Sequence, residues 1–233
     1  MAEPITGISS MAMRGVLSEL RDAYREASKQ EIAIVSVGGV DAARRVRDGE
    51  MFDFVALAAD AIAQLAAIDC VDPATRVDLA RSGIAMAIRT GALRPEIGSG
   101  SAVRDAVLRA RTIGYSTGPS GAHLVRLFER WGIADTIAPR LVQAPPGVAV
   151  GGLIARGDVE LGFQQLSELI HVRGIDVIGM LPPEIQSVTV FSAAVCTASD
   201  RRAAARALLS FLASPEAEPA MHRNGMEPAR SDP

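Results

Sequence analysis

The sequence has few aromatic residues, few cysteines and one lysine among 233 residues. Aromatic residues make up 4% of the chain, with one Trp and two Tyr, so the core has to be aliphatic. Cys70 and Cys196 are too few for a disulfide framework or a zinc site of their own. No run approaches the roughly 18 apolar residues that cross a bilayer. These absences indicate a globular chain, and we expect no metal site and no cofactor.

The charge balance gives no sign of a nucleic-acid partner. Lys and Arg number 24 against 27 Asp and Glu, a formal net charge of -3, whereas nucleic-acid binders carry a basic surplus. The first residues, Met-Ala-Glu-Pro, contain neither a basic segment nor a long apolar stretch. We therefore expect a periplasmic protein if a leader was removed, and a cytoplasmic one otherwise.

Short apolar runs alternate with amphipathic segments along the whole chain. The pattern predicts a helix after Ser10, with Ser10 as its N-cap. Strands are predicted over 31–37, 52–58, 83–89, 112–115, 140–143, 160–164, 176–180 and 189–197. Further helices are predicted over 40–47, 60–68, 101–110, 121–131, 148–156, 166–171 and 201–213. This alternation is typical of the α/β class, with mainly parallel sheets covered by helices on both faces.

Several predicted strands end in turns that open the next helix. The turns that matter here contain small or hydroxyl-bearing residues, namely Ser9 and Ser10, Gly39 and Val40, the segment 116–121, and the segment 145–148. Ligands of open α/β sheets lie beyond the carboxyl ends of strands. Helix N-termini offer unpaired N–H groups and partial positive charge. The turns therefore predict an anion site made of backbone donors and hydroxyls.

The most informative turn follows Tyr115. Ser116, Thr117 and Ser120 supply three hydroxyls, and Gly121 allows a close approach of the backbone. An N-cap turn without a ligand would explain the same residues equally well. The segment lacks the Gly-Lys-Ser/Thr of a phosphate-binding loop and the G-x-S-x-G of a hydrolase nucleophile.

A second polar group stands at the end of the predicted strand 160–164. The amides of Gln164 and Gln165 could donate to a carboxylate, although polar residues at a strand end need no ligand. Glu168 and His171 follow closely and are candidates for acid–base chemistry. Asp41 is a third candidate, but its place in the first turn of a helix favours a partner of the helix dipole.

The ordered series of segments resembles the molybdate-binding branch of the type II periplasmic solute-binding proteins. The resemblance spans nearly the whole chain and rests on 7–11, 42–49, 52–60, 116–121, 151–162 and 211–215. It implies two α/β lobes joined by two crossover strands, lobe I over 1–83 with 187–233 and lobe II over 84–186. It also implies that an anion binds in a cleft between the lobes.

The resemblance assigns family binding positions to particular residues. A Ser after the first strand matches Ser10, and the backbone donors match Ser120 or Gly121 and Gly147 or Val148. The family's second Ser falls at Gly39 or Val40, and its Tyr falls at Gln165. Because these two positions lack the hydroxyl, the resemblance favours an organic carboxylate over molybdate.

Three functions remain open from the sequence. The first is a binding protein for a small anion that works with an ABC-transporter permease. The second is an isomerase of a small unsaturated carboxylic acid, since the same branch includes aconitate isomerase-like proteins. The third is a ligand-sensing domain. Abundant donors suit all three, and no catalytic base stands out among Glu168, His171 and Asp41.

Overall fold

The structure is a computed structural model that describes residues 3–145 and 147–229. The chain divides into two compact units. Unit 1 consists of Met1–Ser82 with Thr189–Pro233, and unit 2 is Gly83–Val188.

Unit 1 is built on a sheet in the order β2-β1-β3-β9-β4, with β10 on β4. Its strands are β1 (Ile5–Ser10), β2 (Ile32–Val37), β3 (Phe54–Ala58), β9 (Val188–Val195), β10 (Glu227–Pro228) and the first part of β4 (Val77–Arg89). Strand β1 runs parallel to β2 and β3, while β9 is antiparallel to β3. Between them lie α1 (Arg14–Ser28), α2 (Gly39–Arg47), α3 (Ala59–Ala67), α9 (Arg202–Leu212), α10 (Glu218–Arg223) and the 3₁₀ turns Met11–Met13, Pro73–Thr75 and Pro215–Ala217.

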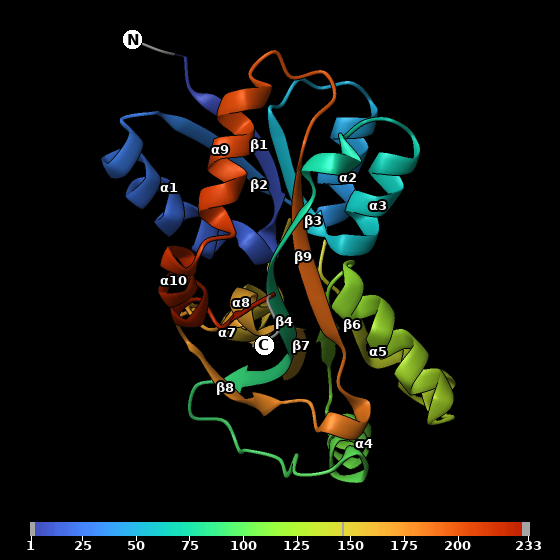
Figure 1. Cartoon of the computed structure of the whole chain (residues 1–233). Coiled ribbons are helices and arrows are strands. Elements are labelled where there is room, and N and C mark those ends of the chain that lie inside the picture. Colours follow the sequence, from blue (N-terminus) through green and yellow to red (C-terminus); the bar gives the residue numbers. More distant parts are fainter. Residues whose placement is uncertain (1–2, 146, 230–233) are drawn as a thin grey trace. The chain divides into compact units, whose positions relative to one another are not determined.

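Helices cover both faces of this sheet. Strand β3 alternates between them, so that Phe54 and Ala56 pack with α1, α9 and α10, while Val55 and Leu57 pack with α2 and α3. The ribbon shows the same two layers of helices, with α1 and α9 on one side and α2 and α3 on the other (Figure 1). A buried strand with apolar residues on both sides is what a mainly parallel sheet requires.

Unit 2 has its own sheet in the order β4-β7-β5-β6, with β8 also on β4. Its further strands are β5 (Ile113–Tyr115), β6 (Leu141–Gln143), β7 (Leu161–Gln165) and β8 (Ile175–Met180). Strands β5, β6 and β7 are parallel, and β4 is antiparallel to β7 and β8. Its helices are α4 (Gly100–Arg109), α5 (Pro119–Arg130), α6 (Ala134–Ile137), α7 (Val150–Arg156), α8 (Leu166–Leu169) and the 3₁₀ turns Ala138–Arg140 and Pro183–Ile185.

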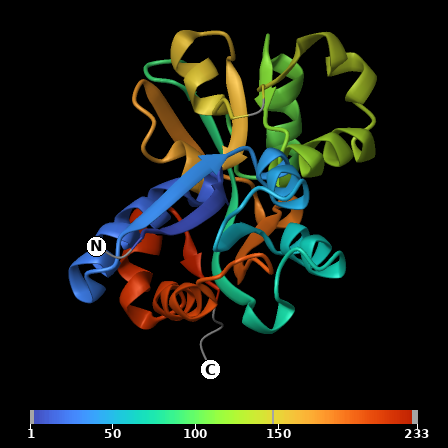
Figure 2. The same cartoon turned by 90° about the horizontal axis from the view of Figure 1, so that it is seen from above.

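The second part of β4 divides the core of unit 2 in the same way. Ile84 and Met86 pack with α4 and α5, whereas Ala85 and Ala87 pack with α7 and α8. The small alanine side chains let α7 approach the sheet closely. Figure 2, which turns the molecule by 90°, separates α5 from the α7–α8 layer of this unit.

The predicted α/β class with helix-covered sheets is confirmed, and the sheets combine parallel pairs with antiparallel pairs that involve β4 and β9. Two local predictions need correction. Ser10 is the N-cap residue, but of the 3₁₀ turn Met11–Met13 that leads into α1 at Arg14, and its hydroxyl makes no capping hydrogen bond. Helix α7 begins at Val150 rather than Val148, because Gly147 has a φ of 77° and Val148 closes a turn onto Pro145. Within the described ranges, every helix is too short or too polar to traverse a bilayer.

Candidate functional site

In unit 1, two adjacent serines end β1 and differ in their hydrogen bonds. The Ser9 hydroxyl lies 2.9 Å from the Ser36 hydroxyl on β2 and also donates to the Ser10 carbonyl at 3.3 Å. The Ser10 Oγ is buried and has no hydrogen-bond partner among the residues that the structure describes. Buried polar groups are almost always paired, so an unpaired hydroxyl at a strand end marks a place for a ligand.

The start of α2 borders Ser10. A Cβ atom built on Gly39 would lie 3.6 Å from the Ser10 Cβ, which places the helix N-terminus beside the unpaired hydroxyl. Gly38 precedes the helix and gives no side-chain cap to its first N–H groups. Val40 is exposed, and Asp41 is held by an ion pair with Arg44. Ser10 and Gly39 therefore form a hydroxyl and backbone-donor group, which we call the β1 group.

In unit 2, three parallel strands end at one edge of the sheet. Gly114 of β5 is level with Gly162 of β7, and Tyr115 is level with Gln143 of β6. The segments that follow the three strands therefore leave the sheet side by side. They are the 116–121 turn after β5, the 144–149 segment after β6, and helix α8, which begins at Leu166 directly after β7.

The loop after β5 brings two hydroxyls together. The Oγ atoms of Ser116 and Ser120 lie 3.0 Å apart in a hydrogen bond, and the Gly118 N–H donates to Ser116 Oγ at 3.3 Å. Gly121 is required at its position, since a Cβ atom there would lie 1.7 Å from the Ser116 carbonyl oxygen. Thr117 is exposed, while Ser120 is buried. Ser116 and Ser120 form what we call the hydroxyl pair.

The loop after β6 leads into α7. Gly147 and Val148 are exposed and precede the helix, and Pro146 of this turn lies outside the described residues. The first N–H group of the helix, that of Val150, donates to Oε1 of Gln164 at 2.8 Å. This donor is therefore already paired inside the protein.

The end of β7 holds a carboxyl group of α8 in place. Gln164 is buried, and its Nε2 donates to Oε1 of Glu168 at 2.7 Å. Burial raises the pKa of Glu168 to about 7, against the opposing effect of the hydrogen bond from Gln164. Gln165 is the last residue of β7, is buried, and lies opposite Ile84 of β4. Glu168 is thus a carboxyl group that exchanges its proton near neutral pH.

Ser167 is a candidate that the sequence patterns did not single out. Its Oγ is buried and, like that of Ser10, has no hydrogen-bond partner in the part of the chain that the structure describes. The sequence offers only its position between Gln164 and Glu168 as a signal, and hydroxyl burial depends on the fold.

The other titratable candidates have different surroundings. His171 is exposed, and His123 places its Nε2 2.8 Å from the Ile185 carbonyl oxygen. His222 lies near Glu227, with 3.3 Å between Nδ1 and the carboxylate. Burial raises the pKa of the Cys196 thiol to about 12, so this cysteine stays protonated. In residues 3–145 and 147–229, no three His, Cys, Asp or Glu side chains are grouped to hold a metal ion.

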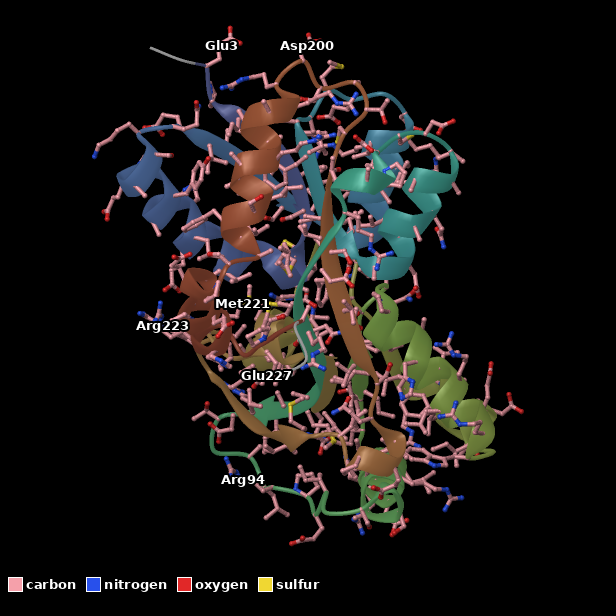
Figure 3. The ribbon with its side chains drawn as sticks, viewed as in Figure 1. Glu3, Arg94, Asp200, Met221, Arg223 and Glu227 are labelled. Atoms are coloured by element: carbon pink, nitrogen blue, oxygen red, sulfur yellow. The ribbon has the colours of Figure 1, made fainter. Side chains whose placement is uncertain are left out.

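A separate pocket lies at the amino end of β1. It is lined by Thr6, Asp53, Ser199 and Arg201, together with Glu3 and Asp200, which Figure 3 labels at one end of unit 1. The Asp53 carboxylate accepts hydrogen bonds from Thr6 N at 2.8 Å and Ser199 Oγ at 2.6 Å. This pocket is at the opposite end of β1 from Ser10, and its carboxylates are unsuited to an anion.

The fold is that of the two-unit α/β solute-binding proteins, as comparison with solved structures shows. The periplasmic molybdate-binding protein of Azotobacter vinelandii has a TM-score of 0.80 at 17% identity, over 95% of this chain and 98% of that chain. The sulfate-binding protein of Mycobacterium tuberculosis has a TM-score of 0.74 at 18% identity, over 98% of this chain and 88% of that one. The expected type II periplasmic-binding-protein fold is confirmed.

The sequence comparisons go further than the fold. The family model described as bacterial extracellular solute-binding protein matches residues 5–227, and the chain belongs to this family. An aconitate isomerase from Pseudomonas sp is 37% identical over 243 residues, covering 100% of this chain and 92% of the relative. The family therefore includes a relative with the name of an enzyme as well as binding proteins.

Proposed function

We propose that the protein binds a small organic carboxylate, with the β1 group of unit 1 as the donors that carry the assignment and the hydroxyl pair of unit 2 as a second candidate group of donors. The observation that carries the proposal is the buried Ser10 hydroxyl without a partner, beside the N-terminus of α2 at Gly39. A hydroxyl and helix N–H groups are the donors that an anion recruits.

The donors favour a carboxylate over a tetrahedral oxyanion. Gly39 and Val40 bring no hydroxyl to the β1 group, and Gln165 stands where the family has Tyr, so this position also lacks a hydroxyl. The two groups of donors contain neither Lys nor Arg, so the ligand's charge is met by dipoles. Each carboxylate group presents two oxygens in one plane, whereas molybdate or sulfate presents four around one centre.

The direct test is ligand-induced stabilisation. We expect citrate or aconitate to raise the melting temperature in a concentration-dependent way, because a ligand that binds the folded state stabilises it by linkage. Molybdate and sulfate serve as the competing class. A melting temperature that responds only to molybdate or sulfate would contradict the carboxylate assignment, and no response to any of the four would contradict anion binding.

As a member of an extracellular solute-binding family, the chain fits a role outside the cytoplasm. We propose that it is periplasmic and passes its ligand to an ABC-transporter permease. Reconstitution of ligand uptake with the permease, in the presence and absence of this protein, tests that partner.

Isomerisation of an unsaturated carboxylic acid is the second candidate function. The observations that favour it are the 37% identical aconitate isomerase and the carboxyl of Glu168, which is held by Gln164. Such an isomerase needs donors for the carboxylates and a group that moves a proton. Incubation with trans-aconitate, followed by proton NMR, should show conversion to the cis isomer. An unchanged spectrum at high protein concentration would exclude this substrate.

A further inference from the structure

The side-chain amide of Gln164 is buried, and its orientation decides whether its oxygen or its NH₂ group faces Glu168. Oε1 of Gln164 accepts the Val150 N–H at 2.8 Å, so this end of the amide must be the oxygen. The NH₂ end therefore points at Glu168, where it donates to Oε1 at 2.7 Å. Because Gln164 is 2% exposed, it cannot turn freely to another partner. Glu168 is consequently held by a donor whose direction is set by the backbone of α7.

The surroundings of Glu168 contain little charge. Helix α8 packs on β7 and α7. Strand β7 has no charged residue, and the only charged residue of α7 is Arg156 at its last position, which pairs with Asp158 at 3.0 Å. His171, beyond α8, is exposed. Among the described residues no cation pairs with Glu168, so burial gives the carboxyl a pKa of about 7, and both protonation states are populated at neutral pH.

Glu168 also lies close in the chain to the edge of the sheet that carries the hydroxyl pair. The register of β5 and β7, with Gly114 level with Gly162, places Ser116, which follows β5, at the level of Gln164 near the end of β7. Two neighbouring strands of unit 2 therefore lead to the two kinds of group. The end of β5 leads to the hydroxyl donors for a carboxylate, and the end of β7 leads to Glu168, whose carboxyl exchanges a proton. Ser167, with its buried unpaired hydroxyl, adds a further donor to the same segment.

We infer that Glu168 transfers the proton in an allylic isomerisation and that Gln164 is its positioning residue, an inference that rests on the second candidate function. In its ionised form Glu168 removes a proton from the saturated carbon next to a substrate carboxylate. The C–H electron pair forms the new double bond, and the electrons of the old double bond take the proton back from Glu168 at the far carbon. The shift needs no oxidant, reductant or second substrate, and Glu168 ends ionised as it began.

The test compares E168Q with the wild type and with E129Q, which changes an exposed glutamate on α5. We expect E168Q to reduce the turnover of trans-aconitate by about a hundredfold to ten-thousandfold. The Kd for tricarballylate, the saturated analogue, should stay within about threefold, because glutamine keeps the size and polarity of the side chain. E129Q should match the wild type in both measurements.

The positioning role of Gln164 has a separate readout. Since the hydrogen bond from Gln164 lowers the pKa of Glu168, Q164L should move the acidic limb of the kcat profile to higher pH. Circular dichroism and a thermal melt show whether the variant is folded, and a folded variant with an unmoved limb would overturn the positioning role.

The outcomes separate this inference from the function on which it rests. A wild type that turns over trans-aconitate while E168Q retains activity within about tenfold overturns the assignment of Glu168 alone. A wild type that binds tricarballylate without any turnover of trans-aconitate overturns the isomerase function and the inference together. That second result leaves carboxylate binding in place.

Discussion

Ser9 and Ser10 are consecutive buried residues of β1, and only the Ser9 hydroxyl is paired within the protein. Ser9 Oγ lies 2.9 Å from Ser36 Oγ, while Ser10 Oγ has no partner in the described part of the chain. Ser9 therefore holds β1 to β2, and Ser10 keeps its hydroxyl for a ligand. The sequence pattern predicted both serines as ligand donors. Their hydrogen bonds in the structure separate the serine that holds two strands together from the serine that is left for a ligand.

The first prediction follows from this difference. S10A should weaken carboxylate binding by about tenfold to a hundredfold, the effect of losing one hydrogen bond to a charged group. Its free energy of unfolding should be unchanged or slightly higher, because no internal hydrogen bond is lost. S9A should instead cost about 1 kcal/mol of stability and bind normally. Calorimetric titration and urea unfolding of both variants measure the two effects, and a reversed pattern would exclude Ser10 as the donor.

The second prediction concerns selectivity at Gly39. A Cβ atom there meets only the Ser10 Cβ, at the ordinary contact distance of 3.6 Å, so G39S should fold normally. Its new hydroxyl beside Ser10 should raise the affinity for sulfate or molybdate relative to a carboxylate by about tenfold, since a tetrahedral oxyanion gains a donor. Competition titrations of G39S and V40S measure this ratio. An equal ratio in G39S and the wild type would show that Gly39 does not set selectivity.

The third prediction tests the hydroxyl pair of unit 2. S120A removes the partner of Ser116 and should weaken ligand binding by about tenfold. Ser99 and Ser101 form a similar pair, with 2.9 Å between their Oγ atoms, at the start of α4. S101A is therefore a matched control and should bind as the wild type does. Equal losses in S120A and S101A, measured by calorimetric titration, would contradict a ligand role for the hydroxyl pair.

Local patterns predicted most of the strands and helices because burial on both faces requires apolar runs. They missed the first half of β4, where Asp78 and Arg81 interrupt the run. The structure accommodates these residues with partners far along the chain. Ser192 Oγ donates to Asp78 at 2.5 Å, and Arg81 lies opposite Glu227 of β10. A strand that depends on such distant partners has no local signature.

The sequence predicted the types of residue in the candidate site, but not the hydrogen bonds that these residues make within the protein. Strand ends followed by small and hydroxyl-bearing residues indicated an anion site. The sequence offered Gln164 as a ligand donor, yet its amide is occupied by Val150 N–H and Glu168. Whether a polar side chain is hydrogen-bonded within the protein depends on residues that are distant in the sequence. The Val150 partner of Gln164 is 14 positions away, and the Ser36 partner of Ser9 is 27 positions away. Only the folded chain reveals which groups stay available.

The fourth prediction concerns Asp53, which supports unit 1 away from the β1 group. Its buried carboxylate accepts hydrogen bonds from Thr6 N, Thr6 Oγ1 and Ser199 Oγ. D53A leaves these donors without their acceptor and should cost about 2–4 kcal/mol in the free energy of unfolding. D158A, which breaks an exposed ion pair with Arg156, should cost less than about 1 kcal/mol. Urea unfolding compares the variants, and equal losses would show that the Asp53 network adds no stability.

The fifth prediction uses the pKa of Glu168 to set the pH dependence of stability. Its pKa is about 7 in the folded chain, against an ordinary value of 4.5. Below pH 4.5 both states hold the proton and its stabilising effect is complete. Between pH 4.5 and 7 only the unfolded state releases the proton, so stability falls as pH rises, by at most about 1.4 kcal/mol per pH unit. Above pH 7 the effect is lost.

The change that tests this dependence is E168Q, which removes the titrating group. Urea unfolding of ligand-free protein at pH 4.5, 5.5, 6.5 and 7.5 should show the wild type losing stability relative to E168Q across this range. The difference between the two proteins isolates Glu168, because their other carboxyl groups are shared. E129Q, altered at an exposed glutamate, should run parallel to the wild type. If E168Q also runs parallel to the wild type, then Glu168 ionises in the folded chain as it does in the unfolded one, and the carboxyl is not the neutral-pH proton carrier that its burial implies.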